Sequence, residues 1–333
     1  MAATPASVLS VRNLSVAFDL PAGAATAVDD VSLDIAPGET LGLVGESGSG
    51  KSVTALALMR LLRRPGRVSG GRALFTDASG TQVDVLTVPA GDMPRIRGRH
   101  IGFVFQEPMT ALDPVQTVGN QIAETLRVHA IASGREARQR AIELLDAVKI
   151  PNAAARVDDY PHQLSGGMRQ RVCIAIAIAC RPSLLIADEP TTALDVTIQA
   201  EILDLLSEMQ ASLGLAMLLI THDLGVIARS AQRVAVMYGG RIVEQGVVRD
   251  VLHTPEHPYT RGLLASLPGA VRGATLTPID GTVPSLGHFP AGCTFHPRCR
   301  DRFAPCDTQV PGVTTLEHGR LVRCHLHETH GAR

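Results

Sequence analysis

The amino-acid sequence predicts an α/β fold with a mixed sheet core, an antiparallel β subdomain, a helical subdomain and a small loop-rich C-terminal extension that contains cysteines. Residues 8–18 alternate apolar and polar side chains, and residues 28–45 contain two further strand-like runs. Residues 107–165 show helical periodicity, whereas residues 183–240 contain short apolar runs that alternate with helical segments. The first pattern favours antiparallel strands, and the last favours a largely parallel sheet with helices on its faces.

Successive segments predict the order of these elements. After the strand-like runs, residues 52–62 change to helical periodicity, and residues 101–105 again resemble a strand. Two helical segments, 119–131 and 135–148, lie in the block that we predict to be the helical subdomain. The three apolar runs that follow are typical of buried strands, and they occupy residues 183–190, 216–223 and 233–240.

The composition changes near residue 246, where Pro and Gly become frequent. We therefore predict a larger domain over residues 1–246, with its helical subdomain at about 107–165, and an extension over residues 247–333.

Charge and hydropathy argue against a nucleic-acid-binding, a membrane-spanning and a secreted protein. Lys and Arg total 31 and Asp and Glu total 32, so a net charge of -1 favours neither nucleic acid nor an anionic membrane as a partner. The longest apolar run, residues 172–180, is half of the roughly 18 to 20 residues that a membrane span needs. The N-terminal residues show no basic segment followed by a hydrophobic one. We therefore expect a cytosolic chain, in which structural disulfides are rare.

A glycine-rich segment, GESGSGKS, follows the apolar run 41–44 and precedes a helix. It fits the pattern G-x-x-x-x-G-K-[ST], in which backbone N–H groups and a helix N-terminus surround phosphate oxygens. Lys51 can reach the β and γ phosphates, and the Ser52 hydroxyl can hold Mg²⁺. A glycine-rich turn with a solvated lysine is the alternative. The candidate ATP-binding residues here are Gly45, Glu46, Ser47, Gly48, Ser49, Gly50, Lys51 and Ser52.

Polar side chains follow three of the apolar runs. Asp188 and Glu189 end one run, His222 ends the next, and Gln106 follows residues 101–105. In a parallel sheet such residues emerge at the carboxyl edge of the strands, where ligands bind. Asp188 suits the Mg²⁺ shell, and Glu189 suits polarising the attacking water. His222 could contact the γ-phosphate, and Gln106 could sense Mg²⁺ and the water. Each, taken singly, also fits a solvated turn, a cap or a core position.

A second glycine-bearing segment, QLSGGMRQR, occupies residues 163–171 at the start of a helix. Ser165, Gly166 and Gly167 form an anion cradle that lies too far along the chain to belong to the first loop. Two phosphate cradles in one chain indicate that each nucleotide is held between two chains.

The full order of motifs resembles that of the ATP-binding-cassette (ABC) ATPases over about residues 8–246. The resemblance rests on the phosphate loop, Gln106, the signature Ser165-Gly166-Gly167-Met168, Asp188-Glu189, Asp195 of the TALD segment, and His222. It implies an ABC-type P-loop NTPase fold, with residues 1–246 as the nucleotide-binding domain. It also places Phe18 where an aromatic ring stacks on adenine; a core-facing strand residue is the alternative.

The resemblance implies a mode of assembly as well. Two cassettes pair head to tail, with ATP between the phosphate loop of one and the signature of the other. ATP binding closes the pair and hydrolysis opens it, so the movement drives a transporter. The expected location is the cytoplasmic side of the cell membrane, where the chain docks as a peripheral subunit through the helical block beside FQEPMTALDP at 105–114.

Three classes compete for the function: a transporter ATPase, a soluble translation or DNA-repair cassette protein, and a kinase-like or GTPase enzyme. A kinase or GTPase has no use for the signature, and this chain carries one uninterrupted cassette. The segments HPYTRGLLASLP and VPSLGHFPAGCTFHPRC resemble the extension of dipeptide and oligopeptide importer ATPases. That resemblance implies a second, non-identical ATPase subunit, two permeases and an extracytoplasmic binding protein. Nickel, haem or sugar cargo is the alternative.

Four cysteines gather in the extension with the spacing C-x5-C-x6-C-x17-C, and they are Cys293, Cys299, Cys306 and Cys324. Cys173 and Cys180 lie in an apolar run and are most simply buried small hydrophobes. In a reducing cytosol, four thiols in a short loop-rich tail favour a metal over two disulfides.

The spacing of the cysteines does not by itself identify the metal. Zinc sites usually contain C-x2-C pairs, which are absent, so the wider spacing suits an iron–sulfur cluster at least as well. The importer subfamily that the tail resembles carries such a cluster, and we therefore predict [4Fe-4S]. Zn²⁺ and unligated or disulfide-bonded cysteines are the alternatives. Nothing in the sequence places this segment near ATP, and we expect it to be an appendage rather than a part of the ATPase machinery.

Overall fold

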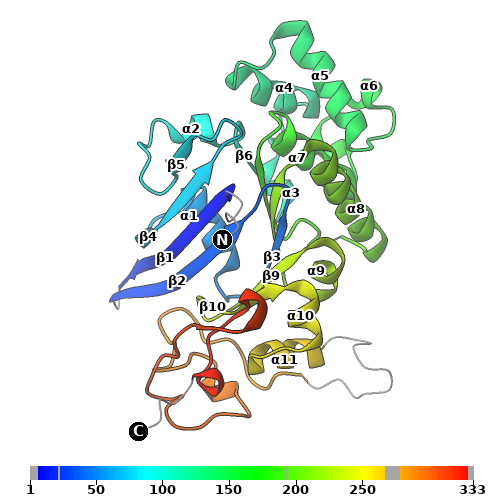
Figure 1. Cartoon of the computed structure of the whole chain (residues 1–333). Coiled ribbons are helices and arrows are strands. Elements are labelled where there is room, and N and C mark those ends of the chain that lie inside the picture. The colour runs from blue at the N-terminus through cyan, green and yellow to red at the C-terminus, as the bar shows by residue number, and fades with distance from the viewer. Residues whose placement is uncertain (1–6, 22, 193, 267–277, 329–333) are drawn as a thin grey trace. The chain divides into compact units, whose positions relative to one another are not determined.

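The structure is a computed structural model that describes residues 7–21, 23–192, 194–266 and 278–328 (Figure 1). The chain forms two compact units. The first comprises Met1–Leu9, Asp34–Thr40 and Leu74–Ile220. The second comprises Ser10–Leu33, Leu41–Ala73 and Thr221–Arg333.

The first unit contains three parallel strands in the order β6-β7-β8. These are β6 (Ile101–Val104), β7 (Leu184–Asp188) and β8 (Ala216–Thr221). Every residue of β7 and β8 is buried, as expected where helices cover both faces of a parallel sheet. The helices of this unit are α2 (Met93–Ile96), α3 (Pro108–Ala111), α4 (Val118–Val128), α5 (Gly134–Ala147), α6 (Ala153–Arg156), α7 (Gly166–Ile178), α8 (Val196–Leu213) and the 3₁₀ turn η1 (Pro161–Gln163).

Helices α4 and α5 form the predicted helical block, and they pack against each other and against α7. The Thr117 hydroxyl caps α4 by accepting a hydrogen bond from the Asn120 amide. Helix α8, the longest among the described residues, follows Asp195, whose carboxylate caps it, and is followed by the C-cap Gly214, which has a φ of 64°. Such a left-handed C-cap favours glycine because glycine has no Cβ to clash with the backbone.

The second unit combines two sheets. Strands β2 (Gly23–Ile35), β1 (Leu9–Leu20) and β4 (Gly66–Thr76) lie side by side in the first of these sheets. Residues 74–76, at the end of β4, belong to the first unit and pair antiparallel there with β5 (Gln82–Asp84). In the other sheet β3 (Thr40–Val44) pairs parallel with β9 (Arg233–Tyr238), which pairs antiparallel with β10 (Arg241–Val247). The helices of this unit are α1 (Lys51–Leu58), α9 (Leu224–Ser230), α10 (Val248–His253) and α11 (Pro258–Ala265). The prediction of a mixed sheet with helices is confirmed.

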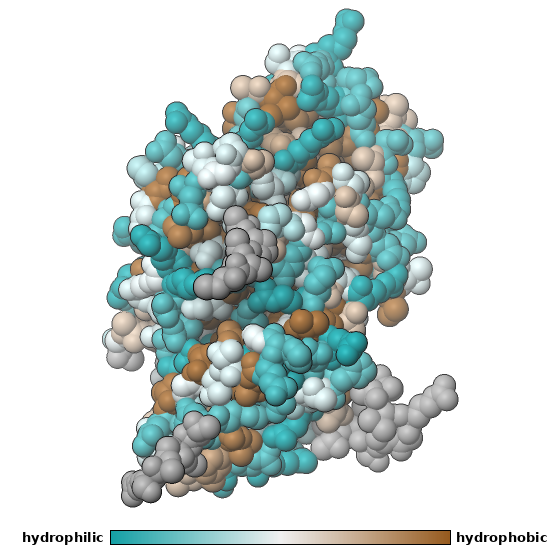
Figure 2. Space-filling view, in the orientation of Figure 1, coloured by the Kyte–Doolittle hydropathy of each residue, from teal (hydrophilic) through white to brown (hydrophobic). Residues whose placement is uncertain are grey.

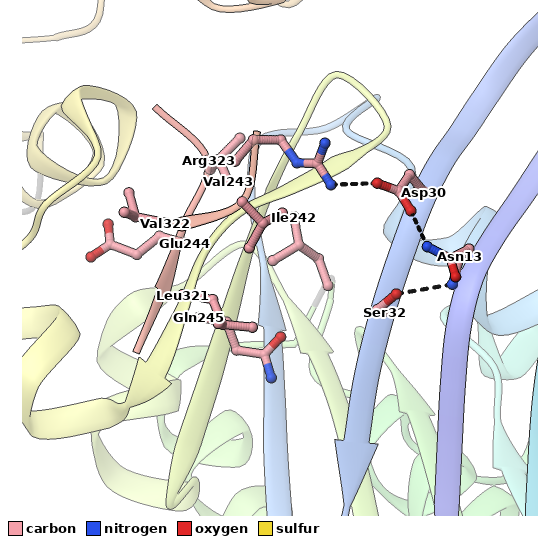
Figure 3. Close-up of a pocket in the computed structure, with 11 residues that line it drawn as sticks. Asn13, Asp30, Ser32, Ile242, Val243, Glu244, Gln245, Leu321, Val322 and Arg323 are labelled. Atoms are coloured by element: carbon pink, nitrogen blue, oxygen red, sulfur yellow. Dashed lines mark hydrogen bonds and ion pairs between the residues drawn. The ribbon is translucent and has the colours of Figure 1, made fainter. Parts of the chain in front are cut away.

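The C-terminal residues extend the sheet of the second unit. Strand β12 (Leu321–Val322) pairs antiparallel with β10, and β11 (Thr314–Thr315) pairs with β12. The short 3₁₀ turns of this region are η2 (His296–Arg298), η3 (Glu317–Gly319) and η4 (His325–His327). Next to β12, Arg323 donates a 2.7 Å hydrogen bond to Asp30, which also accepts from Asn13 (Figure 3). The extension is therefore joined to β2 by side chains and to β10 by backbone pairing.

A buried glutamate connects β10 to the segment before α11. The Glu244 carboxylate is fully buried, and it accepts hydrogen bonds of 3.0 Å from the amides of Glu256 and His257. It also pairs with the Arg320 guanidinium, which is 9% exposed. Because a buried carboxylate is costly unless it is fully hydrogen-bonded, these contacts fix the start of α11 on β10.

His257 makes the second unit sensitive to acid. It is buried, its Nδ1 caps α11 by accepting from the Tyr259 amide, and burial, assisted by the charges of Arg261 and His327, lowers its pKa to about 3. Because the folded pKa is below the ordinary 6.5, the stabilisation is complete above pH 6.5 and is lost as the pH falls. Between pH 7.5 and 5.5 the loss should be about 1.4 kcal/mol.

This prediction can be checked by measuring urea unfolding of the wild type and of His257→Asn at both pH values. Asparagine keeps a capping acceptor but does not titrate. The wild type should lose about 1.4 kcal/mol more than the variant on acidification. Equal losses in the two proteins would show that His257 does not carry the effect.

Within the described residues, no helix has both the length and the hydrophobicity of a membrane span. Figure 2 shows hydrophobic residues on its visible face as scattered patches among polar ones.

Candidate active site

The glycine-rich loop joins β3 to α1 in the second unit. Gly45 has a φ of 157°, and a Cβ atom there would lie 2.1 Å from the carbonyl oxygen of Met237. At Gly50, with a φ of 106°, a Cβ would lie 2.9 Å from the carbonyl oxygen of Ala27. Both positions therefore require glycine, since any side chain would push the loop away from β9 and β2.

Lys51, the first residue of α1, bends back over this loop. Its Nζ donates to the carbonyl oxygens of Gly45 at 2.7 Å and Glu46 at 3.0 Å, and the residue is 4% exposed. The buried Ser49 hydroxyl has no hydrogen-bond partner among the described residues. A lysine held over a glycine-lined loop and an unsatisfied hydroxyl fit the phosphates of a nucleotide. Ser47, Gly48 and Ser52 complete the predicted loop.

Two carboxylates end β7 in the first unit. Asp188 is buried and is the last residue of the strand, whereas Glu189 is partly exposed. Glu189 has a φ of 46°, and its amide donates to the carbonyl of Ile220 at 2.9 Å. A left-handed backbone costs a non-glycine residue about 1 to 3 kcal/mol, and such strain concentrates at functional sites.

Gln106 meets Glu189 at the carboxyl edge of the parallel strands. Because β6 and β7 pair in parallel, with Val104 opposite Ala187, the residues that follow each strand lie close together. The Gln106 Nε2 donates to Glu189 Oε2 at 3.1 Å, and the Thr192 hydroxyl donates to the same oxygen at 2.8 Å. Two donors therefore orient one carboxylate.

Thr192 is a site residue that the sequence did not predict. It lies three residues after Glu189, and its amide also donates to the Glu189 carbonyl in a tight turn. That spacing, in the TT pair after Glu189-Pro190, is the signal that could have identified it.

The predicted signature lies at the start of α7, also in the first unit. Ser165 caps the helix, with its hydroxyl accepting from the Met168 amide at 3.3 Å, and Ser165 and Gly166 are exposed. A Cβ atom at Gly167 would lie 2.7 Å from the side chain of Ile198. Asp195 accepts a hydrogen bond of 3.0 Å from the Ile198 amide. The signature and Asp195 are therefore brought together at the start of α8.

The last two predicted site residues are His222 and Phe18. His222 is exposed between β8 and α9. Phe18 is half-buried on β1, and a Cβ atom at Gly66 would lie 2.8 Å from its ring. Contact with the γ-phosphate and stacking on adenine stay predictions for these two side chains.

Comparisons with known proteins identify the family of this chain. Family models match residues 28–192 as ABC transporter and residues 243–306 as the C-terminal region of oligopeptide/dipeptide transporters. A Brucella melitensis protein named as a peptide import ATP-binding protein is 52% identical over 325 residues, which cover 95% of this chain and 96% of that protein. The chain belongs to the ATP-binding proteins of the ABC transporter family.

Other relatives of this ABC protein support the same conclusion. The dipeptide transport ATP-binding protein DppD of Bacillus subtilis is 49% identical over 323 residues, which cover 96% of this chain and 95% of DppD. The dimeric ATP-binding cassette MJ0796, solved in a post-hydrolysis state with ADP and Pi, has a TM-score of 0.63 and 28% identity, covering 72% of this chain and 99% of that chain.

A further solved cassette, CbiO1 from Clostridium perfringens, is part of the ABC transporter complex CbiONQ. It has a TM-score of 0.62 and 29% identity, covering 74% of this chain and 91% of that chain. The predicted α/β fold of a P-loop ABC ATPase is thereby confirmed, and the ABC protein is an ATPase.

The cysteine cluster requires a correction. Cys293, Cys299, Cys306 and Cys324 are free thiols that line one pocket of about 10 Å³. Among the described residues, no group of three or more His, Cys, Asp or Glu side chains is arranged to hold a metal ion. The predicted [4Fe-4S] cluster is therefore wrong, and the same finding gives no support to Zn²⁺.

Burial explains the state of these thiols. It raises the pKa of Cys299 and of Cys324 to about 11 and also raises the pKa of Cys293. A thiol must lose its proton to bind a metal, and the raised pKa values of Cys293, Cys299 and Cys324 oppose that loss. Cys173 and Cys180 are buried small side chains in the apolar run, as predicted.

Proposed function

We propose that this ABC ATPase is the energy-coupling subunit of an importer for dipeptides and oligopeptides. In this proposal residues 1–246 bind and hydrolyse ATP, and residues 247–333 form an extension of the peptide-importer type. The match to the C-terminal region of oligopeptide/dipeptide transporters and the names of the relatives support peptides as the cargo.

In the first step, the phosphate loop binds ATP. The loop N–H groups and the Lys51 ammonium receive the phosphate oxygens, because Lys51 can exchange its carbonyl partners for them. Phe18 stacks on the adenine, and His222 contacts the γ-phosphate. Ser52, Asp188 and Gln106 would hold Mg²⁺, which would neutralise charge on the phosphates.

In the second step, Glu189 orients the water that attacks the γ-phosphate. The observation that carries this role is the pair of hydrogen bonds from Gln106 and Thr192 to Glu189 Oε2. They hold the carboxylate in one orientation, as a base that positions water must be held. When hydrolysis changes the contacts of Gln106, residues 107–114 move with it, because they follow it directly in the chain.

The site is completed by a partner chain. The exposed Ser165 and Gly166, with Gly167 and Met168, contact the ATP bound to the partner's phosphate loop, and Asp195 lies beside them. The dimeric state of the related cassette MJ0796 supports such a pair. We propose that the partner is a second, paralogous ATPase subunit rather than an identical copy.

Transport requires two transmembrane permease subunits and, beyond them, an extracytoplasmic binding protein. We propose that the ABC ATPase docks on the permeases at the cytoplasmic side of the cell membrane through the segment around α3. Three large hydrophobic residues are exposed there, Phe105 at 40%, Met109 at 59% and Val115 at 79%. Exposed apolar residues gathered in one segment are typical of an interaction surface.

The cargo can be tested through the binding protein encoded beside this gene. Purified without added ligand, that protein should bind dipeptides or short oligopeptides in calorimetric titrations, and should not bind nickel, haem or sugars. Tight binding of a metal, haem or sugar, with no binding of peptides, would overturn the peptide assignment while leaving the ATPase assignment intact.

A further inference from the structure

Glu46, the second residue of the phosphate loop, is held by two side chains from the C-terminal region of the same unit. The Glu46 amide donates a hydrogen bond of 2.8 Å to the hydroxyl of Tyr259. The Glu46 carboxylate accepts from Arg298 through two parallel bonds, of 2.7 Å from Nη1 and 3.0 Å from Nη2. The loop is therefore tethered through both its backbone and its side chain.

The arginine of this tether is buried and fixed by further contacts. The Arg298 side chain is 6% exposed, against 31% for Glu46. Its Nε donates to the carbonyl of Asp280 at 2.8 Å, and the guanidinium lies 5.7 Å from the ring centre of Tyr238. A bidentate pair of a guanidinium and a carboxylate is among the strongest hydrogen-bonded contacts in proteins and is geometrically specific.

The tyrosine of the tether belongs to a buried aromatic cluster. Tyr259 is fully buried, and its ring centre lies 4.6 Å from that of Tyr238 on β9 and 5.3 Å from that of Phe295. Phe295 directly precedes η2, which ends at Arg298. Tyr259 and Arg298 are thus placed by the same packed cluster, so they act on Glu46 together.

We propose that Tyr259 and Arg298 are positioning residues for ATP binding, and that the C-terminal extension thereby sets the affinity of the phosphate loop. Tyr259 accepts the Glu46 N–H, which directs that amide toward the extension, while Arg298 fixes the side chain. This inference rests on the proposed function of residues 45–52 as the ATP-binding loop. It also changes the expectation that CTFHPRC is an appendage apart from the ATPase machinery.

The expected consequence is a change in affinity rather than in the chemical step. A loop rich in glycine has many accessible conformations, and binding is stronger when the bound conformation is already fixed. Without the tether, part of the binding free energy must order residues 45–50. The Michaelis constant for ATP should therefore rise, while the maximal rate changes little because Glu189, Gln106 and Thr192 are untouched.

The test measures the dissociation constant of ATP for the full chain by calorimetric titration, and the kcat and KM of the assembled transporter. Arg298→Lys keeps the charge but loses the bidentate geometry, and Tyr259→Phe keeps the ring but loses the hydroxyl. Each variant should weaken ATP binding about 5- to 10-fold and should keep kcat within about twofold of the wild type. Arg298→Lys weakens a charged hydrogen-bonded contact, and Tyr259→Phe removes a neutral one. The matched control is Arg300→Lys, because Arg300 lies two residues away with an exposed side chain paired to Asp280.

A double variant separates the tether from a general effect on folding. In a Glu46→Ala background, Arg298→Lys should weaken ATP binding no further, because its partner is already absent. A further loss of the same size in that background would show that Arg298 acts by some other route. Thermal unfolding of each variant identifies any protein that has lost its fold.

Lys51→Ala distinguishes this inference from the function on which it rests. If Lys51→Ala leaves ATP affinity unchanged, the proposed ATP site is wrong. If Lys51→Ala abolishes binding but Arg298→Lys and Tyr259→Phe bind ATP as the wild type does, the site stands and the tether does not set its affinity.

Discussion

Replacing Glu189 with glutamine should slow ATP hydrolysis by the assembled transporter about 100- to 1,000-fold, as expected for the loss of a general base. The substitution is nearly isosteric. The amide oxygen of glutamine can still accept from Gln106 and Thr192, which now both donate to Glu189 Oε2. The orientation of the side chain is therefore kept, while its ability to polarise water is lost.

ATP binding should remain intact in the same variant, since the phosphate loop is not altered. The measurements are steady-state phosphate release and calorimetric titration with ATP. The matched control is Glu143→Gln, which changes an exposed glutamate on α5 of the same unit. Near-normal turnover by Glu189→Gln would remove this carboxylate from its assigned role.

Replacing Ser165 with arginine should reduce ATP hydrolysis by the assembled pair about 100-fold, which is the scale of effect for misplacing groups at a reacting centre. Ser165 is exposed at the start of α7, so a long cationic side chain there would occupy the space that the partner's nucleotide needs. The chain's own phosphate loop should bind ATP with unchanged affinity.

The control must reproduce the damage to the helix without touching the signature. Ser165→Arg removes a helix cap, at a cost of about 1 kcal/mol. Thr117→Arg removes the equivalent cap of α4 and adds the same charge. The control should keep most of its hydrolysis. If Ser165→Arg instead lowered only this chain's own ATP affinity, the signature would not serve a site shared between two chains.

The parts of the site that the sequence predicted depend on local patterns. The meeting of Gln106 and Glu189 could be predicted because both follow buried strands, and parallel neighbours end at one edge of a sheet. The requirement for glycine at Gly45 and Gly50 follows from the motif, and the structure gives its cause in the backbone oxygens of Met237 and Ala27.

The contacts that the sequence did not predict are those between distant segments. Glu46 and Arg298 are separated by 252 positions, and neither lies in a periodic pattern that would indicate its partner. The two-residue strand β12 is too short to give an alternating pattern, although it pairs with β10. The Glu46–Arg298 contact and the pairing of β12 with β10 both depend on tertiary packing. Local sequence patterns do not show such packing.

The cysteines show a different kind of error. Their spacing indicated that the four thiols gather, and they do line one pocket. A metal site also needs side chains aimed at a common point, and that depends on loop conformations that the Pro- and Gly-rich sequence leaves undetermined. The spacing was therefore informative about proximity and misleading about ligation.

The most direct test of the account is ATP-dependent uptake of a radiolabelled dipeptide by vesicles that contain the complete transporter, with this chain and ATP inside. Vesicles with the wild-type chain should accumulate the peptide only when both ATP and the binding protein are present, and Glu189→Gln vesicles should not accumulate it. A complex that hydrolyses ATP without accumulating any peptide, or equal accumulation by the Glu189→Gln complex, would contradict it.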